Sequence, residues 1–178
     1  MLGRYENFPE IIHGVARFTC KSSIKNVQQA ILSALHHLNQ EVCSLSTVTP
    51  HLPQKCEVGF ELGVAEDFDF NFLDKKELDR FQRSIAEKEL PMLDFFCVVR
   101  YHVVNGRGKR VPLKFDYHML RFVFQENSME LRICHERGTQ RAPLEDLVIF
   151  ITKCINEELS KKQLKPLSLE YFTKPLIR

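Results

Sequence analysis

The stretch from residue 93 to residue 103 alternates apolar and polar side chains with a period of two. Its odd positions are all apolar, namely Leu93, Phe95, Cys97, Val99, Tyr101 and Val103. Polar residues such as Asp94, Arg100 and His102 stand between them. Because successive side chains of a strand point to opposite faces, this pattern predicts a strand with one face on a core and the other partly in water.

A turn signal follows this strand and sends the chain back on itself. Asn105 and Gly106 readily take positive φ, so together they predict a hairpin. Alternation resumes over residues 111–119 and again over residues 129–134, with a shift of one residue at Leu120. Since such a shift moves every side chain to the opposite face, we expect a bulge or a break there. The whole stretch predicts three or four successive antiparallel strands.

The beginning of the chain carries one strand signal and one helix signal. A period-two segment at residues 12–20 predicts the first strand. The apolar stripe at residues 24–38 has helical spacing, and Ser22 or Ser23 precedes it where a capping side chain is needed. Residues 41–54 show no clear period, so we expect mainly a loop there.

Two further strands and a surface helix are expected before the central meander. Residues 56–64 show the cleanest alternation of the chain, and residues 68–72 continue it after a break. Asp74, with Glu77 three residues on, is the signature of a capping box and predicts a helix from Lys75. The apolar stripe of this helix is thin, so the helix should lie on the surface.

A third helix and an extended tail close the chain. Pro143 followed by acidic residues is a helix-start signal, and an apolar stripe at helical spacing runs to Leu159. The expected order is strand, helix, two strands, helix, four strands, helix. Because strands and helices do not alternate strictly, we predict an α+β fold with helices packed on a largely antiparallel sheet of about six to seven strands. We expect one domain over residues 1–159 and an extended docking tail over residues 160–178.

Composition narrows the class of protein. The 178 residues, 44% of them hydrophobic, suffice for one well-cored domain. No run approaches the roughly 18 apolar residues of a membrane span, and residues 1–10 lack the pattern of a signal peptide. The six cysteines are expected to be buried reduced thiols; they are Cys20, Cys43, Cys56, Cys97, Cys134 and Cys154. We therefore expect an intracellular protein, nuclear or cytoplasmic, without a membrane partner or a cofactor.

Positive charge is concentrated in the second half of the chain. Residues 1–90 carry 10 Lys and Arg against 13 Asp and Glu, whereas residues 91–178 carry 15 against 10. Part of the excess lies in the predicted hairpin and in the loop before the last helix, where the candidate phosphate-binding residues are Arg107, Lys109, Arg110, Arg137 and Arg141. Cations on two such loops can converge on nucleic-acid phosphates. The alternative is an ordinary solvated surface.

Two other clusters carry the residue types of a chemical site. His37, Cys43, His51 and Cys56 fall within 20 residues and suit zinc, but their spacing matches no zinc signature, so we favour core cysteines and surface histidines. A second cluster has the residue types of a nucleophile and a base, namely Cys134, His135, Asp116 and His118. Neighbours on a strand point to opposite faces, so Cys134 and His135 are not expected to meet.

The function predicted from these observations is a non-enzymatic protein-interaction module, a small subunit or adaptor of an intracellular complex. The tail is rich in apolar residues and is expected to add an edge strand to its own sheet or to that of a protein partner. Its candidate partner-binding residues are Leu167, Leu169, Tyr171 and Phe172. A nucleic-acid-binding subunit that uses the basic loops is the first alternative, and an enzyme of unrecognised type is the second.

Overall fold

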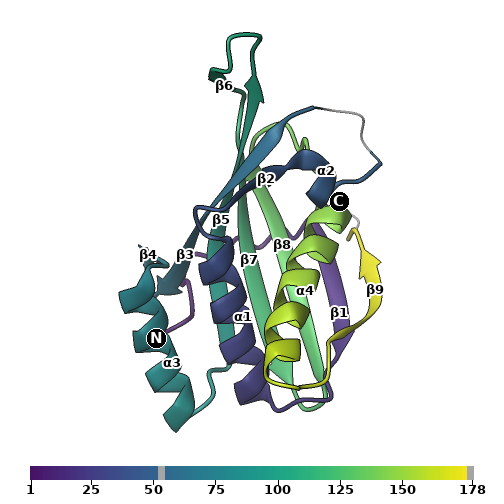
Figure 1. Ribbon diagram of the computed structural model, residues 1–178. Coiled ribbons are helices and arrows are strands. Elements are labelled where there is room, and N and C mark those ends of the chain that lie inside the picture. The colour runs from purple at the N-terminus through teal and green to yellow at the C-terminus, as the bar shows by residue number, and fades with distance from the viewer. Residues whose placement is uncertain (52–54, 176–178) are drawn as a thin grey trace.

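The computed structural model of the protein describes residues 1–51 and 55–175 and confirms the α+β class (Figure 1). Among these residues, nine strands form one sheet and four helices lie along it. The strands are hydrogen-bonded in the order β2-β3-β5-β7-β8-β1-β9, while β4 pairs with β3 and β6 pairs with β5. All of these pairings are antiparallel, as the succession of hairpins predicted.

The elements occur along the chain in nearly the predicted order. The strands are β1 (Gly14–Thr19), β2 (Val42–Ser44), β3 (Glu57–Glu66), β4 (Asp69–Phe72), β5 (Met92–Val104), β6 (Arg110–Pro112), β7 (Asp116–Gln125), β8 (Ser128–Arg137) and β9 (Ser168–Thr173). The helices are α1 (Ile24–Leu38), α2 (Leu45–Val48), α3 (Lys75–Glu87) and α4 (Leu144–Lys161).

The strand count exceeds the predicted six to seven because of β2 and β9. The prediction of a loop at residues 41–54 was wrong in part, since β2 and α2 lie within it. β2 pairs with β3, and Leu45 and Val48 of α2 are buried. Elements of three and four residues are too short to show a period, so only their packing reveals them.

Helices α1, α3 and α4 cover one face of the sheet, and the core lies between the two layers (Figure 1). The odd positions of β5 from Leu93 to Tyr101 point into this core and are fully buried, as their alternation predicted. On α3, the buried residues are Leu78, Phe81 and Ile85, the thin stripe expected of a surface helix. Within the described parts of the chain, none of the helices has the length and apolar character needed to cross a bilayer.

Side-chain caps begin two of the helices where the sequence predicted them. Oγ of Ser23 accepts a hydrogen bond of 3.2 Å from N of Asn26, and Oδ1 of Asp74 accepts one of 2.9 Å from N of Glu77. The backbone N of Asp74 donates instead to O of Phe72 at 2.8 Å. The predicted capping box is therefore present in its N-cap half.

The predicted irregularity near residue 120 occurs slightly earlier. β7 is continuous, but its register with β8 shifts between Tyr117 and His118. The shift of the apolar positions at Leu120 has a second cause. The sheet face away from the helices, which we call the outer face, also carries aromatic residues. On this outer face the ring of Phe96 lies 5.4 Å from that of Phe70 and 5.9 Å from that of Tyr117. Apolar residues therefore occur on both faces of the sheet.

The first residues of the chain run over the outer face. N of Gly3 donates to O of Ala65 in β3, and O of Gly3 accepts from N of Asp94 in β5. Further along, N of Tyr5 donates to the Asp94 carboxylate, which forms a two-point ion pair with Arg121 of β7. This segment thus ties strands together, a role that the sequence did not predict.

Candidate nucleic-acid interface

β5 and β6 project from the body of the molecule as a hairpin, and we call residues 102–112 the arm (Figure 1). Its turn is built as the sequence predicted. Oδ1 of Asn105 accepts hydrogen bonds from N of Arg107 at 2.9 Å and N of Lys109 at 3.0 Å, while Gly108 takes a φ of +72°. A side-chain oxygen that holds two backbone N–H groups gives the tip a defined shape.

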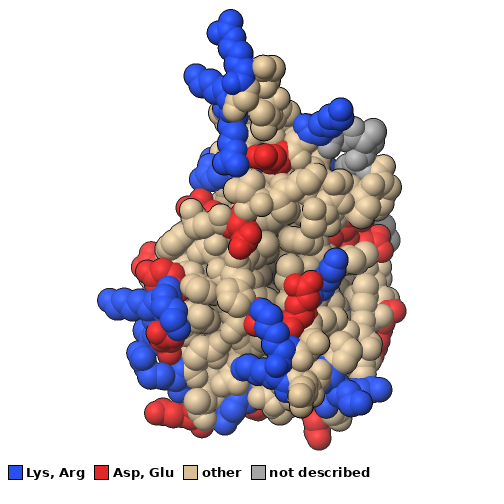
Figure 2. All heavy atoms as spheres, in the orientation of Figure 1, with Lys and Arg blue, Asp and Glu red and all other residues tan. Residues whose placement is uncertain are grey.

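Cationic side chains gather on the arm, as Figure 2 shows at the top of the view. The loop after β8 lies at the same end of the sheet, because Arg137 pairs with Tyr117 near the start of β7. Lys114, which follows the arm, and Arg137 line one hollow of about 370 Å³. Phe115 lines the same hollow. The structure therefore places Lys114, just after the arm, beside Arg137 at the end of β8.

The five predicted phosphate-binding residues differ in their surroundings. Nε of Arg110 lies 3.1 Å from Oε2 of Glu57, and the guanidinium of Arg141 lies 5.5 Å from the ring centre of Tyr101. The described residues place no carboxylate within ion-pair distance of Arg107, Lys109 or Arg137.

Lys114 also has no carboxylate within ion-pair distance among the described residues, and the sequence reasoning missed it as a candidate. Its signal was its place directly after the arm, beside the exposed Phe115. We call Arg107, Lys109, Lys114 and Arg137 the basic end.

A buried carboxylate holds the loop that follows Arg137. Oδ1 of Asp116 accepts from N of Gln140 at 2.7 Å, and Oδ2 accepts from N of Arg141 at 3.0 Å. Tyr101 Oη donates to Oδ2 at 2.6 Å, and His135 Nε2 lies 3.1 Å from Oδ1. Burial alone would raise the pKa of Asp116, but these hydrogen bonds outweigh it and lower the pKa. The loop is thus anchored to the core through an ionised aspartate.

A glycine allows the close approach of this loop. Gly138 has a φ of +111°, and a Cβ at this position would lie 2.3 Å from Oδ1 of Asp116. Only glycine fits both the backbone conformation and the space. The arrangement fixes the backbone next to Arg137.

The cluster with the residue types of a nucleophile and a base does not form a catalytic pair. Sγ of Cys134 lies 3.0 Å from O of Ile11 and 3.2 Å from Oε1 of Glu136 on the outer face. Burial, together with the Glu136 carboxylate, raises the pKa of Cys134 to about 12, so the thiol stays protonated at neutral pH. As expected, it does not meet His135, which instead contacts Asp116. Sequence reasoning missed that contact, because it depends on the register between β7 and β8.

Of the four residues considered as zinc ligands, His37 and Cys43 line one hollow, and His51 and Cys56 are not among its lining residues. Nδ1 of His37 lies 2.6 Å from Glu158 on α4, while His51 contacts Asp146 at 2.9 Å. Cys56 is buried, and all six cysteines are free thiols. Within residues 1–51 and 55–175, no group of three or more His, Cys, Asp or Glu side chains is arranged to hold a metal ion.

The four candidate residues of the tail divide into two kinds. β9 pairs with β1, so the tail adds an edge strand to its own sheet. Leu167 is buried and Phe172 packs over Gly14, whereas Leu169 and Tyr171 are 37% and 46% exposed. The last predicted tail residues, 176–178, lie outside the described residues.

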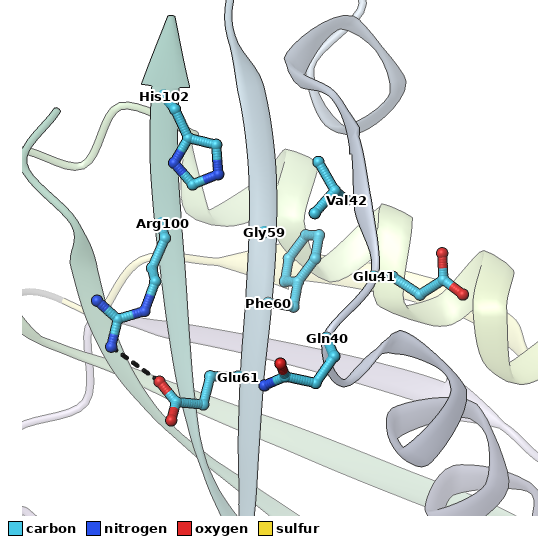
Figure 3. A pocket seen from close by; sticks show the side chains of 8 residues that line it. All are labelled: Gln40, Glu41, Val42, Gly59, Phe60, Glu61, Arg100 and His102. Carbon is cyan, nitrogen blue, oxygen red and sulfur yellow. Dashed lines mark hydrogen bonds and ion pairs between the residues drawn. The ribbon is translucent and has the colours of Figure 1, made fainter. Parts of the chain in front are cut away.

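A hollow of about 270 Å³ lies on the outer face, beside the base of the arm (Figure 3). Residues from β3, β5 and the segment before β2 line it, among them Gln40, Val42, Gly59, Glu61, Arg100 and His102. In Figure 3, Arg100 and Glu61 are joined by an ion pair, with a length of 2.9 Å, and Gln40 reaches towards Glu61 from the other side. The Arg100 guanidinium also lies 5.6 Å from the ring centre of Phe115.

Comparison of the chain with protein-family models, with curated proteins and with solved structures found no match.

Proposed function

We propose that the protein is a non-enzymatic binding module that docks its basic end on the phosphate backbone of a nucleic acid. The observation that carries this proposal is that Lys114, directly after the arm, and Arg137, at the end of β8, line one hollow at the end of the sheet from which the arm projects. Four cations without a carboxylate partner among the described residues lie on the arm, directly after it and at the end of β8. Lys and Arg side chains that bind phosphates displace the counterions condensed on the nucleic acid. The release of these counterions favours binding.

Local concentration of charge matters here because the overall charge is small. The net charge of the chain is +2, so a general attraction to polyanions is weak. Two acidic residues close to the arm, Glu57 and Glu61, form ion pairs with Arg110 and Arg100. The basic end thus keeps its positive potential although acidic residues lie close to it.

A non-enzymatic role is supported by the state of the groups that chemistry would need. The Cys134 thiol is protonated at neutral pH, and the Asp116 carboxylate is occupied by four hydrogen-bond donors that belong to the fold. Asp116 serves to hold a loop, and a carboxylate so engaged is a poor general base.

The test is binding of fluorescently labelled oligonucleotides, followed by anisotropy, between about 50 mM and about 200 mM salt. Affinity is expected to fall linearly on a double-logarithmic plot, with a slope of about 0.7 to 0.9 per phosphate contacted. A variant with Arg107→Glu, Lys109→Glu, Lys114→Glu and Arg137→Glu should lose binding. Arg110 and Arg141 are left unchanged because they contact Glu57 and Tyr101.

The matched control reverses four exposed cations on α3 or directly after α3 and α4, away from the arm. These are Lys76, Arg83, Lys88 and Lys162. The control variant changes the net charge equally and should retain most of the affinity. Absence of binding by the unaltered protein at the lowest salt, or an equal loss in both variants, would refute the proposal.

A second candidate function, docking of a protein partner, is favoured by the edge strand β9. Leu169 and Tyr171 are exposed on this strand although apolar side chains of edge strands are normally covered or replaced by charges. A partner segment that adds a strand would cover them. Cross-linking in cell extract tests this, since a Leu169→Ser, Tyr171→Ser variant should lose its cross-linked partner while the four-cation variant keeps it.

A further inference from the structure

Gly59 lines the hollow beside the arm and contributes no side chain to it. Gly59 lies within β3 opposite Arg100, and its backbone φ is not positive. A Cβ built on Gly59 would have its nearest neighbours at 3.8 Å, among them Nε2 of His102 and Cγ2 of Val42. Neither backbone conformation nor packing therefore requires glycine here.

A second glycine on the same strand and the same face shows the contrast. A Cβ at Gly63 would lie 2.2 Å from the ring of Phe96, so packing excludes any side chain there. Glycine within a strand weakens it, because it gives up side-chain contacts and backbone order. At Gly59 the side-chain contacts are given up although packing does not require it, and the floor of the hollow stays open there.

The walls of the hollow offer hydrogen bonds of several kinds in a small space. Arg100 donates only, the Glu61 carboxylate accepts only, and the Gln40 amide does both. The volume of about 270 Å³ is near the lower end of small-ligand pockets, which begin at roughly 300 Å³. A planar group with donors and acceptors on its edge suits such a hollow, and a nucleobase is a group of this kind.

The hollow also adjoins the basic end. His102, on its wall, pairs with Pro112 and begins the arm. Arg100 lies over the ring of Phe115, which is 42% exposed and directly follows Lys114. A chain of phosphates along the basic end therefore passes close to the hollow, with an aromatic ring between the two.

We propose that the hollow receives one unstacked nucleobase, so that the nucleic acid bound by the basic end is single-stranded. This inference rests on the proposed function. Bases of a duplex are paired and stacked inside it, and removing one from the stack costs free energy. A single strand presents its bases without that cost, and its flexible backbone lets one base turn into a pocket while phosphates stay on the surface.

The experiment compares a single strand, the duplex of the same length and a single strand whose sugars carry no bases. The strand without bases differs from the single strand in its bases alone, while the duplex hides its bases but carries twice the number of phosphates. The unaltered protein is expected to bind the single strand about tenfold more tightly than the other two, the effect of about one well-held base. The Gly59→Val variant, whose side chain fills the hollow, should bind the single strand and the strand without bases alike, with its salt dependence unchanged.

Gly59→Ala serves as a graded control, since its Cβ makes only ordinary contacts and leaves part of the hollow open. Its preference should fall between those of the other two proteins, and thermal unfolding shows whether each variant is folded. Equal binding of the single strand and the strand without bases by the unaltered protein, lost in the four-cation variant, overturns the base pocket and leaves the proposed function standing. A preference that Gly59→Val retains also overturns the pocket. Absence of binding to every ligand overturns both proposals.

Discussion

The hydroxyl of Tyr101 donates a hydrogen bond of 2.6 Å to Oδ2 of Asp116, and this pair connects the core to the basic end. Tyr101 is fully buried on β5, and its hydroxyl also accepts from N of Ala142 at 3.2 Å. Since Asp116 holds the backbone of Gln140 and Arg141, the position of the loop depends on this buried contact.

Tyr101→Phe is expected to destabilise the protein by about 1–2 kcal/mol. The change removes one hydrogen bond to a carboxylate and leaves N of Ala142 without its acceptor. Urea unfolding at neutral pH measures the difference. Tyr117→Phe is the control, because the Tyr117 hydroxyl makes no hydrogen bond with the described residues, and it should change stability by less than about 0.5 kcal/mol. Equal effects would contradict the assigned role of the Tyr101 hydroxyl.

His118 makes stability depend on pH. Burial, with neighbouring His135 acting in the same direction, lowers the pKa of His118 from 6.5 to about 4. Its two ring nitrogens are buried without a hydrogen-bond partner among the described residues. The unfolded chain takes up a proton as the pH falls below about 6.5, while the folded chain does not until about 4. The free energy of unfolding therefore falls across this window, by on the order of 3 kcal/mol.

His118→Leu should reduce that loss. The variant has no imidazole to protonate, and it gives up no hydrogen bond, so its stability near pH 7 should stay close to that of the unaltered protein. Near pH 4.5 it should be the more stable of the two. His135, Asp116 and His13 face the same site and remain present, so the comparison isolates His118. Urea unfolding at both pH values measures the free energies of unfolding. An equal loss of stability in the two proteins between pH 7 and pH 4.5 would contradict the prediction.

The sheet and its helices were predictable because their signals are local. The alternation of β5 from Leu93 to Tyr101 needs only a strand with one buried face. Ser23 and Asp74 announce helices through their own side chains, since each caps the turn that follows it. Such patterns repeat over several residues or bond within three, so no knowledge of the tertiary structure is needed.

The candidate sites depend on contacts between distant parts of the chain, and the sequence shows these poorly. Asp116 meets His135 only through the register of β7 with β8, which is irregular beside it. The role of Gly59 depends on the side chain of His102, which strand pairing brings near. Lys114 lies next to Arg137 only in the folded chain, so the sequence did not show that it belongs to the basic end.

Asp74→Ala should destabilise the protein by about 1 kcal/mol, because N of Glu77 loses its capping acceptor. For a chain of this size the melting temperature should fall by about 2–4 °C. Asp79→Ala is the control on the same helix. Asp79 forms an exposed ion pair with Lys75, and such pairs contribute about 0.3–0.5 kcal/mol. A larger effect from Asp79 than from Asp74 would count against the cap.

Phe172→Ala is expected to cost about 1–3 kcal/mol, whereas Tyr171→Ala should cost less than about 0.5 kcal/mol. The two residues are neighbours on β9, but Phe172 packs over Gly14 against the core and Tyr171 faces solvent. Thermal unfolding of the two variants compares them directly. If the tail were a frayed terminus, both substitutions would leave the melting temperature unchanged.

Gly63→Ala and Gly59→Ala should act in opposite directions, although both add one methyl group to the same face of β3. At Gly63 the new Cβ would meet the ring of Phe96, which is held between Phe70 and Tyr117 and has little room to move. Overpacking of this kind costs about 1–3 kcal/mol.

At Gly59 the new methyl group meets only atoms at 3.8 Å, and alanine orders the strand better than glycine does. Gly59→Ala should therefore be neutral or stabilise the protein by up to about 1 kcal/mol. Urea unfolding of the two variants and the unaltered protein gives both differences in one series. A loss of stability at residue 59 equal to that at residue 63 would mean that packing requires glycine at both positions. The hollow would then be a by-product of the fold, and its glycine would lend no support to a base pocket.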